Sequence, residues 1–116
     1  MEGHRDLIVW QKSMDLLPKI YELAEKFPKS EEYNLKSQIK RAIISVPLNI
    51  AEGKYRYSSK DFIHFLNIAQ ASLVEVDVAL QIALKLKFID DYSEIQNDIN
   101  ELSRMLSSLI TKVNKT

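Results

Sequence analysis

Four stretches of this chain repeat apolar residues at steps of three and four, the spacing that places side chains along one face of an α-helix. The four faces are Leu7, Trp10, Met14, Leu17, Tyr21 and Ala24; Leu35, Ile39, Ala42, Ile43, Val46 and Ile50; Phe62, Phe65, Leu66, Ala69, Leu73, Val76, Leu80 and Ala83; and Ile95, Ile99, Leu102, Leu106, Leu109 and Val113. With two glycines and three prolines among 116 residues, the composition also favours long helices over turn-rich β-structure. The predicted fold class is all-α.

Helix breakers and capping residues separate the four stretches. They are Phe27-Pro28 after the first stretch, Gly53 as a C-terminal cap of the second, Ser58 or Ser59 as the N-terminal cap of the third, and the acidic tract 90–94 before the fourth. Helices of about 20 residues reach roughly 30 Å, and short links make sequential neighbours antiparallel. The sequence therefore predicts a single domain over residues 1–116, an antiparallel up-down-up-down four-helix bundle with bends at Pro18 and Pro47.

Charge, cysteine content and hydropathy exclude several classes of protein. Sixteen acidic residues balance sixteen lysines and arginines, so any binding of nucleic acid must come from a local patch. The sequence has no cysteine, which excludes disulfides, thiolate metal sites and cysteine nucleophiles. No apolar run approaches the roughly 20 residues that cross a bilayer, and the polar start 1–6 is unlike a secretory signal. We expect a cytoplasmic protein without a membrane partner.

Sequence patterns for catalysis and metal binding are incomplete. Asp61-x-x-His64 resembles half of the carboxylate and histidine set of di-iron bundles, but the other half is missing. Glu52 near Asn49 fits a structural hydrogen-bond cluster better than an acid–base site. The sequence also lacks a Gly-x-Ser-x-Gly elbow, a phosphate loop and a dinucleotide-binding turn. We expect no enzymatic activity, no cofactor and no metal.

A second set of apolar residues lies away from the main faces of the second and third helices. These candidate interface residues are Ile44, Leu48, Ile63, Val74, Val78 and Ile82. Exposed together they would form a larger apolar patch than monomers usually carry, which predicts a homo-oligomer. In the alternative, a thick bundle core takes in both sets of residues.

The link between the second and third helices alternates basic and aromatic residues. Its candidate nucleic-acid-binding residues are Lys54, Tyr55, Arg56, Tyr57 and Lys60. Cations contact phosphates and tyrosines stack on bases, so the link is a possible site for RNA or DNA, strengthened in an oligomer by multivalency. In the alternative, the cations are ordinary solvated residues, the tyrosines anchor the link, and the apolar stripes make the protein a scaffold for partner helices.

Several motifs resemble those of a known bacterial family. They are Asp6 to Lys12, Phe27-Pro28-Lys29, Ser37 to Ala42 with Ser45 to Gly53, and Phe62 to Ala69 followed by Ser72-Leu73. Over nearly its whole length the chain resembles the four-helix-bundle proteins encoded within bacterial 23S rRNA intervening sequences, also called the S23 ribosomal protein family.

The resemblance adds expectations about assembly and partners. It implies a bacterial four-helix bundle and, through the related accessory protein of diversity-generating retroelements, a homopentamer. That relative binds nucleic acid and a reverse transcriptase. The family name records where the genes were found and does not imply a component of the ribosome.

Overall fold

The computed structural model describes residues 3–115, and its regular elements are helices joined by short links. A short 3₁₀ turn, η1 (His4–Asp6), precedes α1 (Ile8–Ala24), and a second, η2 (Lys29–Glu31), precedes α2 (Leu35–Lys54). The two longer helices α3 (Ser59–Lys85) and α4 (Ser93–Asn114) follow. No strand occurs among the described residues. The predicted all-α class with four helices is confirmed.

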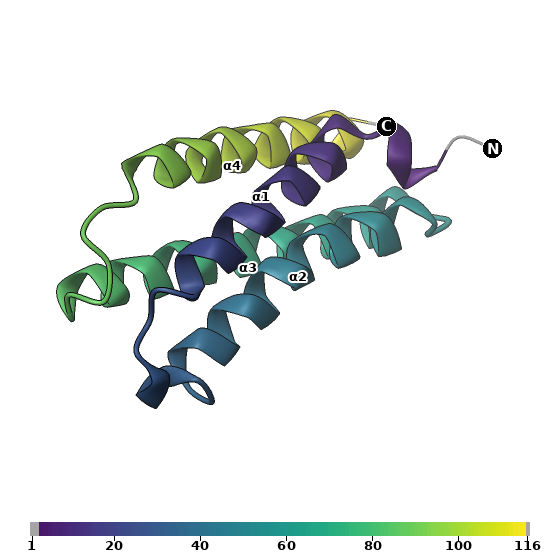
Figure 1. Ribbon diagram of the computed structural model, residues 1–116. Coiled ribbons are helices and arrows are strands. Elements are labelled where there is room, and N and C mark those ends of the chain that lie inside the picture. The colour runs from purple at the N-terminus through teal and green to yellow at the C-terminus, as the bar shows by residue number, and fades with distance from the viewer. Residues whose placement is uncertain (1–2, 116) are drawn as a thin grey trace.

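The four helices pack side by side into a bundle about 45 Å long. Each helix contacts the next along the chain, α1 also contacts α4, and the contact between α2 and α3 is the most extensive. Consecutive helices run in opposite directions, which is consistent with the predicted up-down-up-down topology (Figure 1). The start of α1, the end of α4 and the α2–α3 link lie at one end of the bundle, and the α1–α2 and α3–α4 links lie at the other (Figure 1). We call these the terminal end and the far end.

Large aliphatic side chains from all four helices fill one continuous core. The largest that are fully buried are Ile20, Ile39, Ile43, Ile50, Leu66, Leu73, Leu80, Leu102 and Leu106. Burial of each such side chain contributes about 1.5–3 kcal/mol to folding. The predicted faces of the second, third and fourth helices supply eight of these nine residues, so these faces are confirmed in register. Their half-buried members are Phe62, Phe65, Ile95, Leu109 and Val113.

The predicted apolar face of the first helix is wrong in register. The residues of α1 that are buried are Val9, Ser13, Leu16, Ile20, Leu23 and Ala24. Of the predicted face, Ala24 is buried and Met14 is 39% exposed, whereas the remaining four residues are half-buried. The buried face contains Ser13, whose hydroxyl donates to the backbone carbonyl of Trp10 at 2.7 Å. Because Ser13 interrupts the apolar pattern of the buried face, the sequence favoured the neighbouring face of the helix, on which every residue is apolar.

The predicted cap at Ser58 is confirmed, and both prolines lie inside helices. Ser58 is the N-cap of α3, and its hydroxyl accepts a hydrogen bond from the Asp61 backbone N–H at 3.1 Å. The helices α1 and α2 continue through Pro18 and Pro47. One turn of α2 around Pro47 gains a side-chain bond, because the Asn49 amide donates to the Ser45 carbonyl at 2.8 Å.

By length and composition alone, α3 could cross a membrane, which the apolar runs of the sequence did not indicate. It is the one described helix that meets both criteria, and 39% of its apolar window is buried inside the bundle. The core helices of soluble proteins pass the same test, so this single helix is weak evidence for a membrane span. Its apolar residues are divided between a face that packs on α2 and α4 and a face that is exposed.

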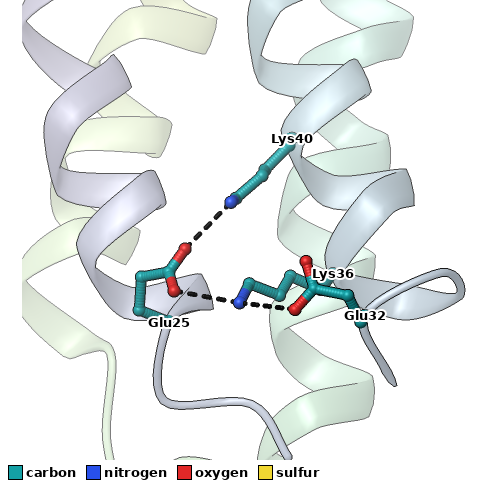
Figure 2. A network of polar contacts seen from close by, with 4 residues as sticks. All are labelled: Glu25, Glu32, Lys36 and Lys40. Carbon is teal, nitrogen blue, oxygen red and sulfur yellow. Dashed lines mark hydrogen bonds and ion pairs between the residues drawn. The ribbon is translucent and has the colours of Figure 1, made fainter. Parts of the chain in front are cut away.

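An ionic network clamps α1 to α2 at the far end of the bundle (Figure 2). The Lys36 ammonium, 8% exposed, lies 2.9 Å from a Glu25 carboxylate oxygen and 3.1 Å from one of Glu32. Lys40 reaches the other Glu25 oxygen at 2.9 Å and lies over the Tyr21 ring. Hydrogen bonds from Lys40 and Lys36 lower the pKa of the Glu25 carboxyl to about 2. The network therefore stabilises the bundle most when Glu25 is ionised.

Replacing Glu25 by glutamine tests this network. Because the pKa of Glu25 is lower in the folded chain than its usual value of 4.5, its contribution is present above that value and is lost as the pH falls towards about 2. We expect Glu25→Gln to lower the free energy of unfolding at pH 7 and to weaken its fall between pH 5 and pH 2, measured by urea denaturation. Glu22→Gln, an exposed carboxylate on the same helix, is the matched control. Equal pH profiles for wild type and Glu25→Gln would contradict the assignment.

Candidate nucleic-acid link and apolar surfaces

The α2–α3 link carries the five predicted nucleic-acid-binding residues at the terminal end of the bundle. Tyr57 is fully exposed, Lys60 is exposed and Lys54 is half-buried. No hydrogen bond or ion pair engages these three side chains within the described part of the chain. In the sequence, these two cations therefore stand on either side of an aromatic ring that is open to solvent.

Arg56 and Tyr55 have partners within the chain, which the sequence did not reveal. The Arg56 guanidinium donates to a Glu52 carboxylate oxygen at 2.6 Å, four residues earlier, and lies 4.6 Å from the centre of the Phe65 ring. This ion pair offsets the charge of Arg56. The predicted pairing of Glu52 with Asn49 is not formed, because Asn49 donates to Ser45 instead.

The hydroxyl of Tyr55 is joined to Nδ1 of His4 by a hydrogen bond of 3.0 Å. His4 also packs edge-on against Trp10, with ring centres 4.7 Å apart. Tyr55 thus fastens η1 to the end of α2, as the alternative interpretation of the tyrosines expected, although 49% of its surface stays exposed.

Gly53 allows α2 and α3 to approach closely just before the link. It is buried within α2 with an ordinary helical backbone, so its predicted role as a helix cap is wrong. A Cβ atom at this position would lie 2.8 Å from Cβ of Phe65 and 3.0 Å from a ring carbon of Phe62. The absence of a side chain at residue 53 therefore sets how the link leaves the bundle.

An apolar groove of about 310 Å³ runs along the surface between α1 and α2. It is lined by His4, Trp10, Met14, Leu17, Ile44, Pro47, Leu48 and Ala51, and at its far side Tyr21 and Pro18 continue it. Ile44 is 39% exposed and Leu48 is 62% exposed. The α1 residues that the sequence placed in the core thus line the wall of this groove, where they join two predicted interface residues of α2. We call this surface the α1–α2 groove.

A second apolar surface follows the outer side of α3. Val74, Val78 and Ile82 are 56%, 43% and 43% exposed, and Ile63 on the same side is half-buried. At about 100° per residue these positions point away from the buried face of α3. We call this surface the α3 ridge. The alternative of a thick core that takes in both sets of apolar residues is wrong, because five of the six candidate residues remain exposed.

The polar positions that resembled a metal or catalytic site are dispersed. His64 is exposed and packs edge-on against Phe65, while the Asp61 backbone takes part in the Ser58 cap. Among residues 3–115, no group of three or more histidine and acidic side chains is placed to hold a metal ion.

Comparisons with known proteins agree with the fold. Residues 5–108 match a family described as 23S rRNA-intervening sequence protein. The structure is similar to the crystal structure of a protein of unknown function from the S23 ribosomal protein family of Bacteroides thetaiotaomicron, with a TM-score of 0.80 and 30% sequence identity. The alignment covers 89% of this chain and 98% of that one. Curated proteins gave no match.

Replacing Gly53 by alanine tests the close approach of α2 and α3. In an open helix this change stabilises by about 0.5–1 kcal/mol. Here the added Cβ meets Phe65, so we expect a loss of about 1–3 kcal/mol in the free energy of unfolding, as is typical of overpacking. Urea denaturation measures the sign directly, and a stabilised variant would contradict the packing.

Proposed function

The chain belongs to the 23S rRNA-intervening sequence protein family, and from this premise we propose that it is a non-enzymatic, homo-oligomeric bundle that contacts RNA or DNA through its terminal end. The observation that carries the nucleic-acid part is the open Tyr57 ring between Lys54 and Lys60, two cations without an ion pair among the described residues. Within a cytoplasmic protein of this kind, the contact would be to phosphates through the lysines and to a base through the ring.

Self-assembly is supported by the exposed apolar surface. The α1–α2 groove and the α3 ridge leave several large aliphatic side chains between 39% and 62% exposed. Contiguous apolar patches of this kind mark interaction surfaces in soluble proteins. We take the assembly to be a pentamer, in keeping with the family resemblance.

Assembly is also what makes nucleic-acid binding effective. Few cations per copy bind weakly at physiological salt, because each neutralised phosphate contributes little by itself. Copies that share an orientation present all their α2–α3 links on one face, so a single strand can meet several links at once. The effective concentration of the second and later links then raises the affinity without new contacts.

The cluster formed by the Ser45 and Ser72 hydroxyls is consistent with a non-catalytic role. The Ser72 hydroxyl donates to that of Ser45 at 2.9 Å, and Ser45 in turn accepts from Asn49. Glu75 lines the same surface pocket, but among the described residues no hydrogen bond joins either serine to a histidine or a carboxylate, so we assign the cluster a structural role in the α2–α3 contact.

A protein scaffold without nucleic acid is the second candidate. It is favoured by the engagement of Arg56 with Glu52 and of Tyr55 with His4, which removes two of the five link residues from a free binding surface. In that case the α1–α2 groove and the α3 ridge would receive helices of another protein.

Charge reversal at the link distinguishes the two candidates. We expect wild type to bind labelled RNA or DNA in fluorescence anisotropy, with binding that weakens steeply between low and physiological salt. Lys54→Glu with Lys60→Glu should weaken binding and reduce the slope of log K against log salt by about 0.7–0.9 for each phosphate that the variant no longer neutralises. The mass in solution should be unchanged.

Lys26→Glu with Lys29→Glu makes the same change in net charge at the far end and is the control. Equal losses in both double variants would indicate a general charge effect and remove the link from consideration. An oligomer that binds no nucleic acid at either salt concentration would leave the scaffold as the better proposal.

A further inference from the structure

We infer that a polar hollow between α2 and α3 binds a small zwitterion, a molecule that carries one ammonium group and one carboxylate. The hollow measures about 430 Å³, within the roughly 300–1,000 Å³ that is typical of small-molecule sites. Its lining includes Gln38, Arg41, Ala42, Ser45, Ser72 and Glu75. The site is separate from the α2–α3 link, and its occupation requires neither nucleic acid nor a particular assembly.

Small side chains form the floor of the hollow, and charged ones form its walls. Ala42 and Ser72 are buried, and Ser45 beside them is half-buried. Arg41 on α2 and Glu75 on α3 are exposed. Because no side chain on the floor is larger than serine, the surface is hollowed between the two charged residues.

The two charged residues stand at nearly the same height on opposite sides of the hollow. The α2 and α3 helices run antiparallel, and the Ser45 and Ser72 hydroxyls meet at 2.9 Å (Figure 1). Arg41 precedes Ser45 by four residues, and Glu75 follows Ser72 by three. At about 1.5 Å per residue they lie roughly 6 and 4.5 Å from the serine contact, both towards the far end. A cation and an anion therefore face each other across the groove.

Neither of these two charges is neutralised within the described part of the chain. Arg41 and Glu75 form no ion pair there, whereas Lys36 and Lys40 of α2 are both paired with Glu25. A ligand with both charges satisfies Arg41 through its carboxylate and Glu75 through its ammonium group. A simple anion or a simple cation meets one charge of its own sign. The hollow therefore selects a zwitterion over either.

The floor of the hollow also holds an unused hydrogen-bond donor. The Ser45 oxygen accepts from the Ser72 hydroxyl and from the Asn49 amide, each at 2.9 Å, which occupies both of its lone pairs. The Ser45 O–H itself has no acceptor among the described residues. Ser45 follows Arg41 by four residues, so the two are neighbours on one face of α2. This donor favours an orientation with the ligand carboxylate at α2 and its ammonium group at Glu75.

Titration with small ligands of graded length tests the inference. The probes are glycine, γ-aminobutyrate and ε-aminocaproate, whose two charges are progressively further apart, and the singly charged controls are butyrate and butylamine. Saturation-transfer NMR on the full chain measures each Kd. We expect at least one zwitterion to bind with millimolar affinity, because exposed charge pairs contribute little each. It should bind at least about 3-fold more tightly than either control.

Three variants locate the binding at the hollow. Arg41→Gln and Glu75→Gln should each weaken the best zwitterion by about 3- to 10-fold, since each removes one charged partner. The exchange of Arg41→Glu with Glu75→Arg keeps one charge of each sign at the site. It should bind the zwitterion, turned end to end, more tightly than either single variant. Both positions are exposed, so the variants should fold, which circular dichroism verifies.

Arg104→Gln and Glu94→Gln are the matched controls, because both residues are exposed on α4, which does not contact α2 within the described chain. They should leave the Kd unchanged. Equal losses in these controls would indicate a general charge effect and overturn the inference. Absence of binding by all three zwitterions, or equal binding of the singly charged controls, would overturn it as well. So would an exchange variant that binds more weakly than both single variants.

Discussion

The close contact between α2 and α3 is the constraint on which the rest of the molecule depends. At the middle of the pair the Ser45 and Ser72 hydroxyls meet, and at the terminal end the absence of a side chain at Gly53 leaves room for Phe62 and Phe65. These two contacts fix the register of the antiparallel pair. The register in turn sets the heights of the outer apolar side chains and the point at which the link leaves the bundle. The α1 and α4 helices pack onto this pair.

Much of the fold follows from the sequence because the buried faces of α2, α3 and α4 consist mainly of apolar residues at steps of three and four. The first helix is the exception for a physical reason, since its buried face includes Ser13, a residue that a search for apolar periodicity passes over. The hydroxyl of Ser13 is satisfied by the Trp10 carbonyl one turn earlier, so burial does not leave it without a hydrogen bond. The stripe that the sequence favoured is the wall of the α1–α2 groove.

The link residues can be identified from the sequence, but the sequence pattern does not show which of their side chains are paired with other residues. An arginine four residues after a glutamate can pair with it in a helix, and Arg56 pairs with Glu52 in this way although it lies just past the end of α2. The partner of Tyr55 is His4, separated from it by 51 positions, so no local signal could have identified it. The exposure of Tyr57 and of the two lysines likewise depends on the tertiary fold.

The two apolar sides of α3 have a consequence for a newly synthesised copy. Its inner side is covered as soon as the bundle folds, whereas its outer side waits for another copy under the proposed assembly. Burial of the outer side is then a second-order step, whose rate rises with the abundance of the protein, and apparent stability becomes dependent on concentration. A cell that makes few copies would keep a larger share of them as subunits with exposed valines, which are targets for chaperones and proteases.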